Sequence, residues 1–260
     1  MDEKTKELLI NLSDKYEKRE FIEKDPSRFM HDYKENRDKE AAAFIASALS
    51  FGRREQILSH VKKILDECGS SPADWLLSGK HNEFFDEGEK SFYRYFSHND
   101  LKIYCENLSS FLKNSPDGTL GSYFRSLYEE EKGKEEGRKY LHQIVCSAFS
   151  ENCALVPRTK TSAAKKVNMM LRWLVRKDSP VDLGIWTWFS QENLLMPLDT
   201  HVMSESYKLN LLLKTPSGKE KSASLKTAII LTEVMKEVFP LDPVRADFAL
   251  FGLGVDENGI

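Results

Sequence analysis

Long apolar runs are missing from this chain of 260 residues. None approaches the roughly 20 residues that a membrane-spanning helix needs, so no transmembrane helix is predicted. The first residues, Met-Asp-Glu-Lys-Thr-Lys-Glu, carry charges of both signs and lack the apolar core of a signal peptide. These absences predict a cytoplasmic protein with no membrane partner.

Cysteine is scarce as well. The four cysteines follow no spacing that is typical of zinc or iron–sulfur sites: Cys68, Cys105, Cys146 and Cys153. Buried free thiols in a reducing compartment are the expected state. The sequence therefore predicts neither a metal nor another cofactor.

An excess of one charge sign is also missing, because the formal net charge is only −3. This balance argues against a protein that coats nucleic acid with its whole surface. One stretch nevertheless holds basic residues and no acidic residue: Arg158, Lys160, Lys165, Lys166, Arg172, Arg176 and Lys177. Such a basic stripe can hold a polyanion in one place, or it can be an ordinary solvated helix face.

Strand patterns are not evident, and the chain is predicted to be all-α. Residues 39–51 are rich in alanine and almost entirely apolar, which predicts a buried helix. After Gly52, apolar residues between Ile57 and Leu65 recur at helical spacing and predict a second helix. The aromatic residues of segment 73–128 are expected to pack in the core, with a stacking surface for bases as the alternative.

A lysine and an aspartate stand at the starts of two further predicted helices. The segment from Ser162 to Lys177 has an apolar stripe at helical spacing, and Ser162 is in position to cap it. Lys165 then lies in the first turn beside Lys166, where the helix dipole and the neighbouring charge favour the neutral amine of a nucleophile. Asp199 is expected to be an N-cap, and a carboxylate there can also stabilise developing positive charge.

These segments resemble a known superfamily. Residues 197–202, Pro-Leu-Asp-Thr-His-Val, are similar to the motif with the catalytic aspartate of helix-hairpin-helix DNA glycosylases. Lys165 opens a helix as the catalytic lysine does in the bifunctional members. The separation of Lys165 and Asp199 is similar to that in archaeal 8-oxoguanine glycosylases, and residues 43–65 resemble the helix pair that opens the glycosylase domain. Over its whole length the chain more closely resembles the bacterial family called domain of unknown function 2400.

The resemblance implies a helix-hairpin-helix glycosylase-like fold with two helical subdomains flanking a cleft. The first would be residues 39–177, which end in the hairpin and the basic helix, and the second residues 1–38 plus 178–260, which carry Asp199. It also implies that Lys165 attacks the sugar C1′ of a flipped nucleotide and forms a Schiff base, assisted by Asp199.

Other residues are candidates for contacts with DNA and with the damaged base. The superfamily hairpin usually contains glycines that let backbone amides approach a phosphate, and residues 155–165 contain none. Polar side chains are therefore the DNA-binding candidates: Arg158, Lys160, Ser162, Lys166, Arg172, Arg53 and Arg54. Aromatic residues and a histidine near Asp199 are candidates for the base pocket, with packing as the alternative: Trp186, Trp188, Phe189 and His201.

The sequence predicts a monomeric, nucleoid-associated base-excision repair enzyme that acts on damaged double-stranded DNA. It would be a DNA glycosylase with AP-lyase activity, and 8-oxoguanine is the first base to test. One alternative is a non-catalytic protein of the same fold that binds a DNA or RNA structure through the basic stripe. A second alternative is a metal phosphohydrolase that uses His31, Asp32, His98 or His201.

Overall fold

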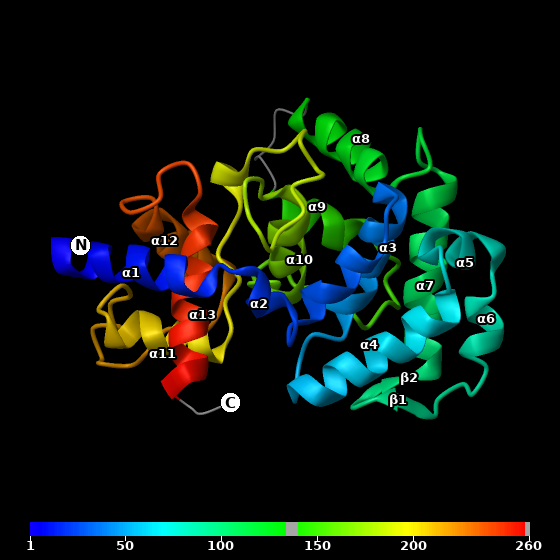
Figure 1. Ribbon diagram of the computed structural model, residues 1–260, viewed down its shortest axis with the longest axis horizontal. Coiled ribbons are helices and arrows are strands. Elements are labelled where there is room, and N and C mark those ends of the chain that lie inside the picture. Colours follow the sequence, from blue (N-terminus) through cyan, green and yellow to red (C-terminus); the bar gives the residue numbers. More distant parts are fainter. Residues whose placement is uncertain (134–139, 258–260) are drawn as a thin grey trace. The chain divides into compact units, whose positions relative to one another are not determined.

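The structure, a computed structural model, describes residues 1–133 and 140–257. The chain is mostly α-helical, as the sequence predicts (Figure 1). A short antiparallel pair of strands, β1 (Ser91–Tyr93) and β2 (Phe96–Ser97), was not predicted. Among the described residues, no helix combines the length and the apolar character needed to cross a membrane. All four cysteines are free and buried, as expected.

The chain folds into two compact units. We call residues 23–158 the central unit and residues 1–22 with 159–260 the terminal unit. The predicted division, at residues 38 and 177, differs from this one because it assigned the basic helix to the other part of the chain. In the structure, Arg172 and Arg176 of that helix form buried ion pairs with carboxylates of the terminal unit. These pairs attach the helix to the unit that carries Asp199.

The central unit is built around a buried alanine-rich helix. Its helices are η1 (Pro26–Asp32), α3 (Asn36–Ala48), α4 (Arg54–Cys68), α5 (Pro72–Ser78), α6 (His81–Phe84), α7 (His98–Lys113), α8 (Leu120–Lys132) and α9 (Leu141–Ala148). Helix α3 packs against η1, α5 and α8, and residues 41–49 are buried, which confirms the predicted core helix. Helix α4 buries Ile57, Val61, Ile64 and Leu65, as their spacing predicts.

Most aromatic side chains of segment 73–128 pack inside the central unit. Phe111, for example, is buried and lies edge-on to the rings of Phe124 and Phe149. Tyr95 is an exception, with 72% of its surface exposed. Core packing therefore accounts for most of these residues, and a stacking surface for bases is not needed to explain them.

A buried histidine makes the stability of the central unit sensitive to acid. His142 in α9 is buried, and its Nδ1 has no hydrogen-bond partner among the described residues. Burial lowers the pKa of His142 to about 4, below its ordinary value of 6.5. Between these two values the unfolded chain binds the proton more tightly than the folded chain. The folded state is therefore destabilised as pH falls from 6.5 to 4, by up to about 3 kcal/mol.

We expect His142→Phe to remove this sensitivity, because phenylalanine cannot take up the proton. We measure the free energy of unfolding of the variant and of the natural chain by urea denaturation. The difference between the two values should change by about 2–3 kcal/mol between pH 7.5 and pH 4.5. The value at pH 7.5, where the histidine is neutral in both states, reports the change in packing alone. A difference that is the same at both pH values would contradict the prediction.

The terminal unit combines the two ends of the chain. Its helices are α1 (Glu3–Tyr16), α2 (Arg19–Ile22), α10 (Lys165–Val175), η2 (Gln191–Asn193), α11 (Thr200–Lys208), α12 (Leu225–Met235), η3 (Pro243–Arg245) and α13 (Ala246–Glu257). Helix α13 packs against α1 and α11 (Figure 1). At Gly252 the α1 and α13 helices are so close that a Cβ atom would overlap the ring of Tyr16. Phe248 of α13 forms a core cluster with Ile22 and Val181.

Candidate functional site

Lys165 is the first residue of α10 and follows a strained turn. The preceding residue, Ala164, has φ 44° and ψ 47°, the left-handed conformation that usually favours glycine. The Asn168 side chain donates a hydrogen bond to the Ala163 carbonyl oxygen at 2.8 Å and supports the turn from within the helix. The segment therefore makes a tight turn without the glycine that the resemblance would require.

Ser162 does not cap α10, so that prediction was wrong. The helix begins three residues later, and the Ser162 hydroxyl accepts a hydrogen bond from the backbone N–H of Ala164 at 3.0 Å. The backbone of Ser162 pairs with that of Ser224, and the Leu225 N–H donates to the Thr161 carbonyl oxygen at 2.8 Å. The start of α12 thus supports the turn before Lys165.

Asp199 is the N-cap of α11, as the sequence predicts. Its side chain accepts a hydrogen bond from the Val202 N–H at 2.9 Å. The residues before it, 194–198, are buried, and the Met196 N–H donates to the Thr232 hydroxyl of α12 at 3.0 Å. Core packing and α12 therefore determine where this carboxylate lies.

The two residues that were predicted to cooperate lie together. The Lys165 Nζ is 3.8 Å from the Asp199 Oδ2, and the side chains are 28% and 18% exposed. A small shift or one water molecule is enough for proton transfer at this distance. Because both side chains keep exposed surface, a ligand can reach the amine and the carboxylate.

The two roles of Asp199, as a helix cap and as a charged group, can be separated by substitution. Asp199→Ala removes the capping oxygen, and we expect a loss of about 1 kcal/mol in the free energy of unfolding. Asp199→Asn removes the charge but keeps a good capping side chain, so we expect a loss within about 0.5 kcal/mol. Urea denaturation of both variants measures this difference. Equal losses in the two variants would show that capping is not what the side chain contributes to stability.

Arg172 lies inside the terminal unit and is not available to contact DNA. Its side chain is 5% exposed, with Nε 3.3 Å from Asp182 and Nη1 paired with Asp247. Its guanidinium also lies over the Phe248 ring, 4.2 Å from the centroid. The assignment of Arg172 to the DNA-binding residues is corrected for this reason: its donors bind carboxylates of the same unit.

Arg176 extends the same network. The guanidinium is buried, with Nε 2.8 Å from Asp242, Nη1 3.0 Å from Asp182 and a further pair to Glu17. Arg245 also binds Glu17, with Nε 2.8 Å from the carboxylate. We call these residues the buried Arg–carboxylate cluster: Arg172, Arg176, Arg245, Glu17, Asp182, Asp242 and Asp247. The sequence interpretation missed the cluster, and its one signal was two arginines four residues apart, one within and one directly after the otherwise apolar residues 169–175.

Burial and ion pairing act in opposite directions on the carboxyl groups of this cluster. For Glu17, burial alone would raise the pKa, but hydrogen bonds from Arg176 and Arg245 outweigh it and the pKa is lowered. For Asp242, burial prevails over the attraction of Arg176 and raises the pKa to about 6. Carboxyls of one cluster therefore differ in how tightly they hold a proton.

The candidates for the base pocket divide into core and partly exposed residues. Trp186 and Phe189 are buried, and the backbone N–H of Trp186 donates to the Leu174 carbonyl oxygen at 2.7 Å. Packing explains these two residues. Trp188 is half-buried and stacks on Trp186, with ring centroids 5.3 Å apart. His201 is half-buried and lies edge-on to Phe251, so Trp188 and His201 keep some accessible surface.

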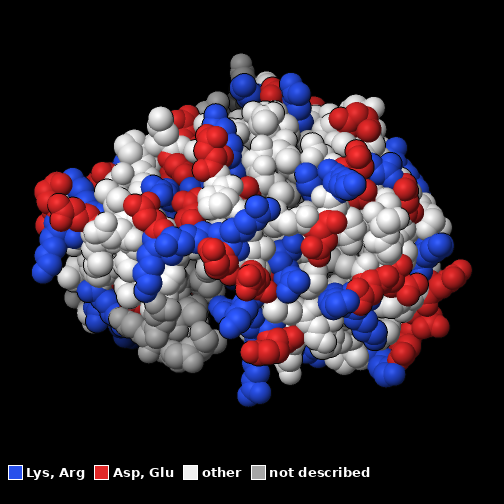
Figure 2. All heavy atoms as spheres, viewed as in Figure 1, with Lys and Arg blue, Asp and Glu red and all other residues white. Residues whose placement is uncertain are grey.

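The remaining DNA-binding candidates belong to both units. Lys160 is exposed and Lys166 half-buried in the terminal unit. In the central unit, Arg53 is exposed and Arg54 half-buried, and the exposed Arg158 donates to the Phe149 carbonyl oxygen at 3.1 Å. On the face shown in Figure 2, basic and acidic side chains are interspersed rather than gathered into areas of one sign. This distribution suits local contacts better than a broad basic surface.

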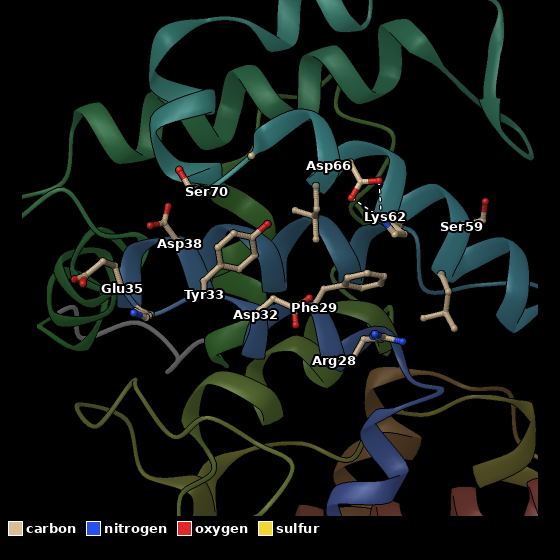
Figure 3. Close-up of a pocket in the computed structure, with 14 residues that line it drawn as sticks. Arg28, Phe29, Asp32, Tyr33, Glu35, Asp38, Ser59, Lys62, Asp66 and Ser70 are labelled. Carbon is tan, nitrogen blue, oxygen red and sulfur yellow. Dashed lines mark hydrogen bonds and ion pairs between the residues drawn. The ribbon is translucent and has the colours of Figure 1, made fainter.

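A separate groove lies in the central unit, between η1, the start of α3 and α4 (Figure 3). Its volume is about 770 Å³. Its lining includes charged residues of both signs, among them Arg28, Asp32 and the Lys62–Asp66 ion pair. Burial and nearby acidic groups raise the pKa of Tyr33 in this groove. The sequence did not predict the groove, because turn residues and both polar and apolar side chains of separate helices form it.

The residues proposed for a metal phosphohydrolase are not assembled into a ligand set. Within the part of the chain that the structure describes, no three His, Cys, Asp or Glu side chains form a group that could hold a metal ion. His98 is buried against the rings of Phe85 and Phe92, which explains it as a packed residue. No observation favours this alternative.

Fold and site together define a mostly α-helical protein whose terminal unit carries a lysine–aspartate pair at the starts of two helices. The family model described as a protein of unknown function (DUF2400) matches residues 25–256, and the chain belongs to this family. No curated protein and no solved structure matches the chain significantly.

Proposed function

We propose that the protein is a DNA glycosylase with AP-lyase activity and a helix-hairpin-helix glycosylase-like fold. The observation that carries the proposal is the Lys165–Asp199 pair, with 3.8 Å between amine and carboxylate and both side chains accessible. The left-handed turn at Ala164 supports the hairpin, because it presents Lys165 at the start of a helix. Damaged DNA, with 8-oxoguanine as the first base to test, is the proposed substrate.

In the proposed reaction the Lys165 amine forms a bond to C1′ of a nucleotide that is flipped out of the duplex. The glycosidic bond breaks, and its electron pair leaves with the base, which takes up a proton. The Asp199 carboxylate stabilises the positive charge that develops on the sugar and then accepts a proton from the attached nitrogen. Ring opening, in which the ring oxygen takes up this proton, gives a protonated Schiff base. Loss of a proton from C2′ then expels the 3′ phosphate and cleaves the strand.

A borohydride trapping panel tests the proposal, because reduction of the Schiff base links protein and DNA irreversibly. The duplexes carry 8-oxoguanine, an oxidised pyrimidine, an abasic site or no damage. We expect an adduct with the abasic duplex and with at least one damaged base, and none with undamaged DNA. An adduct with the abasic duplex alone would indicate a lyase without glycosylase activity. No adduct with any duplex would refute the proposal.

A non-catalytic protein that binds a DNA or RNA structure is the second candidate function. It is favoured by the exposed Lys160 in the turn before α10 and by the capping role of Asp199, which explains that residue without chemistry. Binding of this kind would fall steeply with salt concentration. It would be nearly unchanged in Lys165→Gln and Asp199→Asn, with no release of a base.

A further inference from the structure

A third carboxyl group lies close to the candidate site. Asp247, in the first turn of α13, is 6% exposed and accepts a hydrogen bond from Nη1 of Arg172. Arg172 stands seven residues after Lys165 in α10, which places the two side chains on one helix face two turns apart. Asp247 therefore lies along the face of α10 that presents the Lys165 amine.

Helix α13 also adjoins the second half of the site. It packs against α11, which begins directly after Asp199. The Phe251 ring lies 6.1 Å from the His201 ring, and a Cβ at Gly254 would be 2.9 Å from the Cβ of His201. Helix α13 thus contacts α10 through the Asp247–Arg172 pair and α11 through Phe251 and Gly254, all within the terminal unit.

The charges of the cluster make Asp247 a group that can change its protonation. The cluster as defined has four carboxyls and three guanidiniums, and a buried excess of negative charge favours the retention of a proton. Burial raises the pKa of Asp247 to about 6, although Arg172 opposes the rise, and the negative charge of Asp199 adds to it. Lys165 acts in the opposite direction.

Charged and titratable groups face Asp247 from several elements. Those that act on its charge are Lys165, Arg172, Asp182 and Asp199. Further along α13, Tyr16 of α1 lies against Gly252 and His201 of α11 lies against Gly254. Arg172 and Asp182 belong to the cluster and Lys165 and Asp199 to the site. Both Lys165 and Asp199 act electrostatically on Asp247.

We propose that Asp247 is a positioning residue of the Lys165–Asp199 site. Arg172 holds Asp247 in place, and Asp247 couples the charge of the Lys165 amine to protonation of the buried Arg–carboxylate cluster. As a carboxylate, Asp247 favours the ammonium form of Lys165, and as a neutral acid it does not. The catalytic consequence rests on the proposed function, whereas the coupling is a property of the folded chain alone.

Nuclear magnetic resonance tests the coupling without any substrate. The side-chain carboxyl carbons of aspartate and the ε carbons of lysine are labelled with ¹³C, and Asp247→Asn and Lys165→Gln identify the two resonances. We expect the Asp247 resonance to titrate with a midpoint near pH 6, and the Lys165 resonance to shift with the same midpoint. That shift should disappear in Asp247→Asn. A Lys165 resonance that does not move between pH 5 and pH 7 in the natural chain would refute the inference, even where the variant does not fold.

Asp242→Asn is the matched control. The pKa of Asp242 is also raised to about 6 by burial, but this carboxyl binds Arg176 rather than Arg172. We expect the Lys165 shift to persist in this variant. Loss of the shift in both variants would assign the effect to the cluster as a whole and overturn the specific role of Asp247.

Trapping rates on an abasic duplex test the catalytic consequence. The ratio of the Asp247→Asn rate to the natural rate should rise about threefold as pH increases from 5 to 7, because the variant has no carboxylate to hold the ammonium form. A purely structural defect would lower the rate by the same factor at every pH. If the Lys165 resonance shifts with the Asp247 titration but no adduct forms with any duplex, the proposed function is refuted and the role of Asp247 is supported. If adducts form but the Lys165 resonance does not shift, the role of Asp247 is refuted.

Discussion

Lys165→Gln is expected to abolish the borohydride-trapped adduct and to lower the trapping rate at least about 10³-fold, because glutamine has no amine to form the Schiff base. The effect should not come from unfolding. The Lys165–Asp199 pair is partly exposed, and such pairs contribute at most about 1 kcal/mol to stability. The measurement is the rate of adduct formation on an abasic duplex, with urea denaturation to check the fold.

Lys166→Gln is the control for this prediction. Lys166 is the adjacent residue in the same helix turn and is also half-buried, so the two variants lose the same charge in nearly the same place. We expect Lys166→Gln to keep the adduct and to lose no more than about tenfold in rate, through weaker attraction of the DNA backbone. An adduct that survives Lys165→Gln and disappears in Lys166→Gln would identify Lys166 as the nucleophile.

Arg176→Met is expected to reduce the free energy of unfolding by about 3–5 kcal/mol, because it removes the buried guanidinium that three carboxylates share and leaves Asp242 without the arginine it binds. Arg176 is 2% exposed and pairs with Glu17, Asp182 and Asp242. Methionine keeps much of the aliphatic volume, so the lost charge dominates the effect. Urea denaturation at pH 7.5 measures the change. A loss below about 1 kcal/mol would show that the carboxyls take up protons and tolerate the substitution.

A surface ion pair supplies the comparison for Arg176→Met. The Lys62 Nζ lies 2.6 Å from the Asp66 Oδ1 in α4, but each side chain is 63% exposed. Lys62→Met should therefore change the free energy of unfolding by no more than about 0.5 kcal/mol, since solvent screens an exposed pair. The contrast between the two variants separates the effect of a buried charge from the loss of an ion pair as such.

The cluster also connects stability with the proposed chemistry. Arg172 of α10 binds Asp247, and Arg176, the C-cap of α10, binds Asp242, so two arginines one turn apart attach α10 to the C-terminal part of the terminal unit. If the proposed function is correct, the same helix presents the nucleophile at its first residue. Substitutions in the cluster should then affect the trapping rate through the position of α10, whereas Lys165→Gln removes the reacting group itself.

Local sequence patterns were sufficient to predict the features that depend on residues close in the sequence. The alanine-rich segment 39–51 predicted a buried helix and the spacing from Ile57 to Leu65 a second helix, and α3 and α4 confirm them. Asp199 was recognised as an N-cap because a cap is determined by the residue and the few that follow it. Ser162 satisfied the same preference, but the left-handed turn at Ala164 moved the start of the helix to Lys165.

Sequence patterns were enough to predict the mostly helical fold, the buried cysteines, the N-cap at Asp199 and the place of Lys165 in the first turn of a helix. They did not predict that Lys165 and Asp199 lie 3.8 Å apart, that Arg172 is buried or that α10 belongs to the terminal unit, all of which depend on the folded chain. The reason is physical. Helix propensity and capping depend on neighbours within one or two turns. Whether an arginine is exposed or buried depends instead on whether folding brings carboxylates to it from distant parts of the chain, as it brings Asp247 to Arg172 and Glu17 to Arg176.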